Sequence, residues 1–200
     1  MSLVTSDAGA VGSGYSMSEL EMVAAVARAL WVWDTLDLEL GDMVVVTGSS
    51  RQARLVALVA TWYGPAQVLL VTDDQSSAPA GVTAHPMLTG AEETGSLSAR
   101  LGERPGVAAA EFSGRTDTID ALLESIPRFS RLLLAGEARE PVTIDYYNNV
   151  HRKGVRLVSA VLANEERLPG HAARVERARR LLARPARRQA CLELLAAASS

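Results

Sequence analysis

The stretch at residues 43–74 constrains the fold of this 200-residue chain more strongly than any other. It opens on a run of three valines, residues 44–46, which is typical of a strand buried on both faces. Apolar side chains then recur at helical spacing through residues 55–63, and Gly64 and Pro65, which follow, are expected to end the helix. Residues 68–71 repeat the buried strand. Because parallel strands need a crossover connection, the stretch predicts a strand–helix–strand unit of a parallel sheet.

The N-terminus of the predicted helix is a place where such a unit can bind an anion. Free N–H groups and the positive end of the helix dipole attract phosphate there. Asp73 and Asp74 follow the second strand, at about the ~20-residue offset where dinucleotide-binding units carry an acid for the ribose. The spacing predicts a Rossmann-like fold with a dinucleotide site.

The turn matches the G-x-G-x-x-G motif only in part. Counting from Gly48 places Ser50 and Ala53 at the second and third glycine positions. Ala53 is an accepted substitute, whereas a side chain at Ser50 hinders the close approach of backbone to pyrophosphate. A shifted register places Arg51 and Arg54 there, which could pair with phosphate but cannot copy a glycine turn. Intact dinucleotide binding and a Rossmann shell that binds nothing both stay open.

The rest of the chain continues the alternation of strands and helices. Ser18 is a candidate N-cap for an apolar helix whose Trp31 and Trp33 are predicted to pack in the core. Further strands are expected at residues 82–85, 107–112 and 131–135, and further helices at residues 97–101 and 118–126. The pattern predicts an α/β fold with a doubly wound, mostly parallel sheet and helices on both faces, formed by residues 18–165.

Composition and charge exclude several classes of protein. The net charge of −3 and the pI near 5.7 give no drive toward nucleic acid or an anionic membrane. The one cysteine, Cys191, excludes an intrachain disulfide and fits a reducing cytoplasm. No apolar run approaches the roughly 20 residues that span a bilayer. Residues 1–17 lack a basic region followed by an apolar core, and we expect a flexible leader there.

The C-terminal segment, residues 166–200, is predicted to form two short helices broken near Pro185. It carries seven clustered arginines: Arg174, Arg177, Arg179, Arg180, Arg184, Arg187 and Arg188. Because no aromatic side chains are interleaved with them to stack on bases, we interpret them as a solvated face that pairs with acids elsewhere. Cys191 is expected to be a small buried residue.

Five segments occur in an order that resembles a known family. They are VAAVARALWVWDTLDLELGDMVVVTG, VLLVTDD, AAAEFSG, RLLLAG and IDYYNNVHRKGVRLVSAV. Together, over residues 19–163, they resemble the coenzyme domain of the medium-chain, zinc-type alcohol dehydrogenases, with AEFSG in the place of that family's E-x-x-G. The resemblance implies an oxidoreductase-like domain that binds NAD or NADP.

The resemblance does not include the catalytic domain of the family. Its members carry a GroES-like domain that supplies zinc ligands, and here only a short leader precedes the coenzyme region. The sequence has no G-H-E motif and no cysteine cluster, and His85, His151 and His171 show no ligand spacing, so no zinc site is predicted. His151 is expected in the loop before the last strand. There the resemblance makes Arg152 and Lys153 candidate anion contacts, with solvated charge as the alternative.

The predicted cofactor site lies at the carboxyl ends of the strands. The catalytic residues are unknown, and Asp145, Tyr146 and Tyr147 are interpreted as a polar loop. The candidate cofactor-binding residues are Gly48, Ser49, Ser50, Arg51, Gln52, Asp73, Ser113, Gly114 and Gly136.

We favour NAD over NADP, because a carboxylate at the end of the second strand repels a 2′-phosphate. The family's usual count places that acid at Thr72, one residue before Asp73, so NADP held by Arg51 or Arg54 stays an alternative.

The apolar run at residues 155–162 is expected at the edge of the sheet, where an exposed strand invites pairing with another chain. The resemblance implies a homodimer joined through these edges. The alternative is an edge covered by the C-terminal segment.

Three functions follow from these observations. The first is an oxidoreductase that works without zinc, or with a catalytic partner protein. The second is a nucleotide-binding module, favoured by Gly48 and Asp73. The third is a dimeric scaffold that has lost its phosphate site, favoured by Ser50, Arg51 and Arg54.

Overall fold

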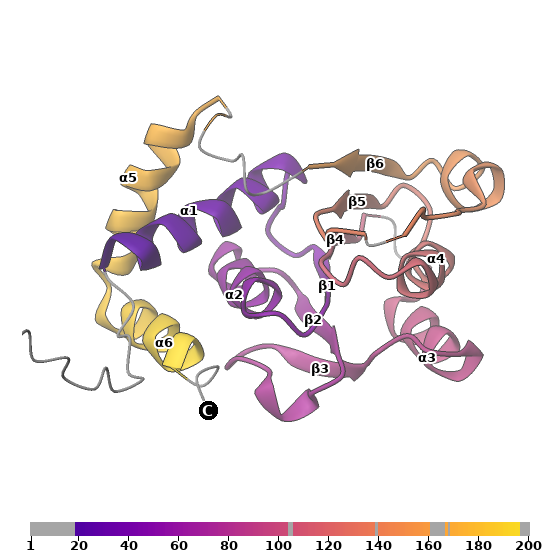
Figure 1. Cartoon of the computed structure of the whole chain (residues 1–200), viewed down its shortest axis with the longest axis horizontal. Coiled ribbons are helices and arrows are strands. Elements are labelled where there is room, and N and C mark those ends of the chain that lie inside the picture. The colour runs from indigo at the N-terminus through magenta and orange to yellow at the C-terminus, as the bar shows by residue number, and fades with distance from the viewer. Residues whose placement is uncertain (1–18, 104–105, 139, 161–166, 168, 197–200) are drawn as a thin grey trace, which may run out of the picture.

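The computed structural model describes residues 19–103, 106–138, 140–160, 167 and 169–196. These residues form a sheet with the strand order β3-β2-β1-β4-β5-β6, in which every neighbouring pair is parallel (Figure 1). The strands are β1 (Met43–Thr47), β2 (Gln67–Thr72), β3 (Thr83–Pro86), β4 (Ala108–Glu111), β5 (Arg131–Leu134) and β6 (Arg156–Ser159). The predicted doubly wound α/β fold is confirmed. The predicted leader, residues 1–17, lies outside the described residues.

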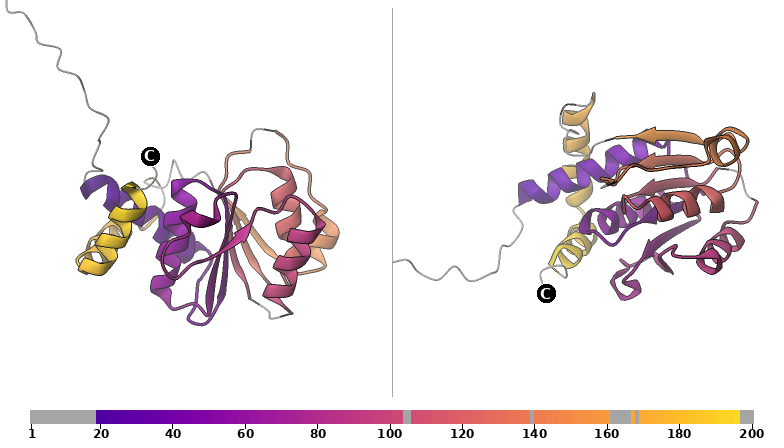
Figure 2. Two further views of the ribbon diagram at one scale, coloured as in Figure 1. Left: turned by 90° about the horizontal axis from the view of Figure 1, so that it is seen from below. Right: turned by 45° about the vertical axis from the view of Figure 1, so that its right-hand side comes forward.

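Helices cover both faces of the sheet (Figure 2). The helices are α1 (Glu19–Thr35), α2 (Arg51–Ala60), α3 (Ala91–Leu101), α4 (Thr116–Ser125), α5 (His171–Leu182) and α6 (Pro185–Ala196). Val44 and Val46 of β1 belong to the core beneath α1 and α2, whereas Val45 belongs to the core beneath α3 and α4. The run of valines is therefore buried on both faces, as predicted. Trp33 is fully buried, and Trp31 packs against the same core.

Two local predictions were wrong. Helix α3 starts at Ala91, six residues before the predicted start. The start was missed because the first turns of the helix bury only Thr94 and show little apolar pattern. The segment interpreted as a polar loop contains a π-helix, η3 (Tyr146–His151), so His151 ends a helix. The cause is the Asp145 carboxylate, which accepts a hydrogen bond from the Asn148 N–H at 3.0 Å and caps this turn.

The two predicted C-terminal helices are confirmed as α5 and α6, with Pro185 as the first residue of α6. Helix α5 packs on α1 and α6 packs on α2 (Figure 1). Arg177 of α5 donates hydrogen bonds to Asp34 Oδ1 at 2.8 Å and to the Tyr63 hydroxyl at 2.6 Å. The guanidinium of Arg187 lies 5.0 Å from the centre of the Trp62 ring. Specific polar and cation–π contacts thus fasten this segment to the α1–α2 face.

The arginine face of the C-terminal helices matches the prediction in part. Arg188 pairs with Glu19 and Arg179 with Glu176, each at 3.8 Å and with exposed side chains. Arg174 departs from the prediction because it is buried. Cys191 is fully buried, and this burial raises the pKa of its thiol to about 11. The thiol is therefore protonated at neutral pH and a poor nucleophile.

Candidate functional site

The strand order reverses between β1 and β4, and the carboxyl ends of these two strands lie side by side. Open α/β sheets bind ligands in the crevice at such a switch point. Thr47 ends β1 and Glu111 ends β4, as directly paired residues. The loops that follow β1, β2, β4 and β5, together with the first two residues of α2, carry the residues predicted for the site.

The turn after β1 depends on Gly48. Its φ of +123° is a conformation that residues with a side chain rarely adopt, and an added Cβ would lie 3.1 Å from the Cβ of Phe112. Ser50, two residues later, is the N-cap of α2, because its hydroxyl accepts a hydrogen bond from the Ala53 N–H at 3.1 Å. The second glycine position of the motif is thus occupied by a capping serine.

Ser49 joins this turn to the end of β2. Its hydroxyl lies 3.1 Å from Asp73 Oδ2, and it accepts the Asp73 N–H, also at 3.1 Å. The buried Thr72 hydroxyl lies 3.1 Å from the same Ser49 oxygen. Residues 24 positions apart in the sequence, Ser49 and Asp73, are therefore in direct contact at the switch point.

The two acids after β2 have different partners. The Asp74 carboxylate caps the 3-10 turn η2 (Gln75–Ser77) by accepting the Ser76 N–H at 3.1 Å, and it pairs with Arg54 at 3.6 Å. The hydrogen bond from the Ser76 hydroxyl is the main cause that lowers the pKa of Asp74. Both acids are exposed; Asp73 contacts Ser49 in the turn after β1, whereas Asp74 contacts Ser76 in the loop that follows.

Glu111 is the principal site residue that the sequence interpretation missed. Its side chain is fully buried, and its carboxylate accepts hydrogen bonds from the Thr47 hydroxyl at 3.2 Å, the Ser113 N–H at 2.5 Å and the Gly114 N–H at 3.1 Å. The Ser113 hydroxyl also donates to it. The E-x-x-G pattern contained this residue, but the pattern alone does not show where its donors lie.

The turns after β4 and β5 touch at Gly114 and Gly136. An added Cβ on Gly136 would lie 2.5 Å from the Gly114 nitrogen and 2.9 Å from Glu111 Oε2, and an added Cβ on Gly114 would overlap the Glu137 carbonyl. Glycine is required at both positions because backbone approaches backbone.

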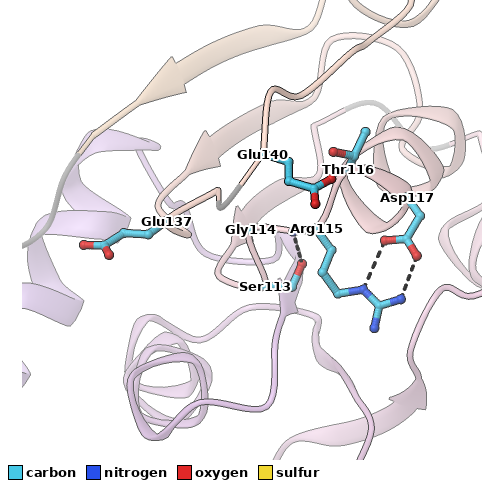
Figure 3. A pocket seen from close by; sticks show the side chains of 7 residues that line it. All are labelled: Ser113, Gly114, Arg115, Thr116, Asp117, Glu137 and Glu140. Atoms are coloured by element: carbon cyan, nitrogen blue, oxygen red, sulfur yellow. Dashed lines mark hydrogen bonds and ion pairs between the residues drawn. The ribbon is translucent and has the colours of Figure 1, made fainter.

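A cavity of about 580 Å³ opens beside these turns (Figure 3). Ser113, Gly114 and the start of α4 form one side, and Glu137 and Glu140 lie on the loop after β5. Charged side chains dominate this lining.

Arg115 and Asp117 form the best-defined ion pair of that lining. They are joined by two hydrogen bonds of 3.1 and 2.6 Å, which are the main cause that lowers the pKa of Asp117. The same hydrogen bonds raise the pKa of Arg115, with a smaller contribution from the charge of Asp73.

The predicted residues fall into two groups. Gly48, Ser49, Ser50 and Asp73 form one group, and Ser113, Gly114 and Gly136 form the other. Glu111 contacts the second group directly, and it also contacts Thr47, the residue before Gly48 of the first group. Arg51, the first residue of α2, is exposed, and its neighbour Gln52 has a buried side-chain nitrogen with no hydrogen-bond partner among the described residues.

Arg152 and Lys153 do not belong to this site, which corrects the expectation of anion contacts there. They precede β6 and lie at the amino ends of the strands. The Lys153 ammonium donates hydrogen bonds to the carbonyls of Leu123, Glu124 and Ile126 at 2.8, 2.7 and 3.1 Å, and so caps the end of α4. Arg152 donates to Asn148 at 3.3 Å.

Among the described residues, no group of three or more His, Cys, Asp and Glu side chains could hold a metal ion. Within the same residues, no helix is long and apolar enough to cross a membrane.

No protein-family model and no curated protein matches the sequence. Solved structures do match. Galactitol-1-phosphate dehydrogenase from Escherichia coli has a TM-score of 0.67 at 16% identity, over 82% of this chain and 48% of the other. 2R,3R-butanediol dehydrogenase from Bacillus subtilis has a TM-score of 0.67 at 17% identity, over 80% and 46%. A protein described as a zinc-binding dehydrogenase from Sinorhizobium meliloti 1021, bound to NADP, has a TM-score of 0.63 at 16% identity, over 79% and 47%.

These matches establish the fold. The chain has the Rossmann-like α/β fold found in zinc-type alcohol dehydrogenases, as the sequence resemblance predicted. It spans about half the length of the dehydrogenases that it matches.

Proposed function

We propose that this chain is an oxidoreductase-like domain that binds NAD or NADP at the switch point between β1 and β4. The observation that carries the proposal is the contact between Ser49 and Asp73, which joins the turn after β1 to the acid after β2. Gly48 supports the proposal, because the absence of a Cβ allows the turn after β1 to pack closely against Phe112. This arrangement fits a dinucleotide whose phosphates lie at the start of α2 and whose ribose lies at Asp73.

Asp73, Ser49 and the start of α2 have separate roles in the proposed site. The exposed Asp73 carboxylate would accept hydrogen bonds from the adenosine ribose, and Ser49 holds that carboxylate in place. The first turn of α2 contains no acid that would repel phosphate. A bound nicotinamide would supply the hydride donor or acceptor. A catalytic partner protein is proposed as one source of the substrate-binding part. The matched dehydrogenases are about twice as long as this chain.

We propose NAD as the preferred cofactor. The Asp73 charge would repel a 2′-phosphate, and Arg54, which could bind one, is paired with Asp74 at 3.6 Å. A non-catalytic scaffold is the second candidate function. It is favoured by Ser50, whose hydroxyl already takes the Ala53 N–H that a phosphate could use.

An Asp73→Ala variant tests the proposed cofactor site. We expect calorimetric titration to give a micromolar Kd for NADH with the unchanged protein, or about −8 kcal/mol. The variant should bind NADH about tenfold more weakly, because ribose hydroxyls lose a charged acceptor. The variant should also discriminate less against NADPH, relative to NADH, than the unchanged protein does.

Asp74→Ala is the matched control, since Asp74 is also exposed but its carboxylate caps η2. We expect its affinity for NADH to stay within about twofold of the unchanged protein. Absence of any heat or thermal shift with millimolar NAD, NADH, NADP and NADPH would refute nucleotide binding and favour the scaffold.

We also propose that the chain is cytoplasmic and forms a homodimer through β6. Among the described residues, β6 pairs only with β5, so its outer edge is open. The Arg156 N–H donates to the carbonyl of Ser130, just before β5, at 2.9 Å, and the Ala160 N–H donates to that of Leu134 in β5 at 3.1 Å. Because alternate residues of a strand face opposite sides, the N–H groups of Leu157 and Ser159 are directed toward a partner. The remainder of the predicted edge, residues 161–162, lies outside the described residues.

Ser159→Pro tests this dimer. Proline removes an outward N–H and places its ring where a partner strand would pair, while the bonds of β6 to β5 stay. We expect light scattering after size exclusion to give twice the monomer mass for the unchanged protein and for the Ser159→Ala control. The proline variant should run as a monomer. A dimer that survives the proline substitution would place the interface elsewhere.

A further inference from the structure

We propose that Glu111 is the positioning residue of the nucleotide cleft, an inference that rests on the proposed function. Its carboxylate fixes the turn after β4 against the ends of β1 and β5. It thereby positions the turn that would line one side of a bound dinucleotide.

The burial of Glu111 calls for an explanation. A carboxylate removed from water is costly unless its oxygens are well satisfied. Among the described residues no basic side chain forms an ion pair with Glu111, and all its donors are neutral: two backbone N–H groups and two hydroxyls. Charge-assisted hydrogen bonds of this kind are stronger than those between neutral groups. An anion held only by such bonds makes its donors rigid.

Those donors come from separate parts of the chain. Thr47 ends β1, and its paired residue in β4 is Glu111 itself. Ser113 and Gly114 form the turn between β4 and α4. On the other side, Oε2 lies so close to Gly136 that a Cβ there would be 2.9 Å from it. One carboxylate therefore touches the ends of three neighbouring strands.

The backbone of Glu111 reinforces the same arrangement. Its carbonyl accepts the N–H groups of Ala135 and Gly136 at 2.9 and 2.8 Å. The loop after β5 is thus bound to Glu111 by its main chain, and the turn after β4 by its side chain. Because both loops also line the cavity of about 580 Å³, the position of Glu111 determines the shape of that cavity.

Glu111 also occupies the N–H groups that could compete for phosphate. With the Ser113 and Gly114 N–H groups bonded to the carboxylate, they are not available to a ligand. The next helix start, at α4, has Asp117 in its first turn, and that carboxylate accepts the Thr118 N–H at 2.8 Å. The start of α2 has no acid. The charges at the switch point therefore direct the phosphates to α2.

The test compares Glu111→Ala with Glu111→Gln. Glutamine keeps an oxygen at the position of Oε1, which accepts bonds from Thr47, Ser113 and Gly114. We expect Glu111→Gln to bind NADH within about threefold of the unchanged protein, and Glu111→Ala to bind it at least about tenfold more weakly. Amide hydrogen exchange at Ser113 and Gly114 in the nucleotide-free protein should be faster in Glu111→Ala than in Glu111→Gln or the unchanged protein.

The exchange measurement separates this inference from the proposed function. If the unchanged protein binds no nucleotide but Glu111→Ala still frees the two amides, nucleotide binding fails and the positioning role stands. If the amides stay protected in Glu111→Ala, or if that variant binds NADH as well as the unchanged protein, the positioning role is wrong. Glu124→Ala is the control, because this carboxylate of α4 is exposed.

A second variant covers the case in which Glu111→Ala does not fold. Thr47→Val keeps the shape of the side chain and removes only the bond from β1 to the carboxylate. We expect about threefold to tenfold weaker NADH binding and faster exchange at Ser113. Unchanged affinity together with unchanged exchange in Thr47→Val would overturn the proposal.

Discussion

A Gly114→Ala variant is expected to lose about 3 kcal/mol of its free energy of unfolding. The φ of Gly114 is +64°, a left-handed conformation that residues with a side chain seldom adopt. The larger cause is steric, because the new Cβ would overlap the carbonyl of Glu137 in the loop after β5. Since that contact is backbone, the two loops must separate. Thermal unfolding followed by circular dichroism should show a midpoint roughly 6–12 °C lower.

Gly41→Ala separates the two causes. Gly41 has a φ of +86°, and no atom lies within 4 Å of the position that its Cβ would take. We expect this variant to lose only about 1 kcal/mol, which is the cost of the left-handed backbone alone. Equal losses in the two variants would show that the loops after β4 and β5 yield easily. The rigid wall of the cavity would then need another explanation.

The elements that the sequence predicts well have their cause within a few neighbouring residues. The valines of β1, the helical spacing of α2 and the breaker at Gly64 are local patterns, and the structure places β1 and α2 within a few residues of the expected bounds. The start of α3 was missed because only Thr94, Leu97 and Leu101 of that helix are buried. A helix with so narrow an apolar stripe gives a weak periodic signal.

The parts of the candidate site that the sequence did not predict depend on contacts between distant residues. Glu111 is buried because its hydrogen-bond donors arrive from residue 47 and from residues 113 and 114. Lys153 was a candidate anion contact, with solvated charge as the alternative, but it caps α4, whose final carbonyls lie about thirty residues earlier in the chain. Asp73 was predicted because its position relative to Gly48 follows from the length of one strand–helix–strand unit.

The largest loss of stability is expected for Trp33→Ala, at about 4 kcal/mol. Trp33 is fully buried in α1, and its indole N–H donates a hydrogen bond to the Val56 carbonyl of α2 at 2.9 Å. Removal of the ring would leave a cavity between the two helices that cover one face of the sheet. Because α5 packs on α1 and α6 on α2, the C-terminal segment would lose its support as well.

Urea unfolding followed by far-ultraviolet circular dichroism measures this effect, and two variants distinguish its parts. Trp33→Phe keeps most of the apolar volume and removes the donor to Val56, so we expect a loss of about 1–2 kcal/mol. Trp31→Ala removes a partly exposed ring from the same helix and should cost about half as much as Trp33→Ala. If Trp31→Ala and Trp33→Ala were equally destabilised, the contact between α1 and α2 would not depend on the buried indole. The packing of α1 on the sheet would then be the interaction that holds this face together.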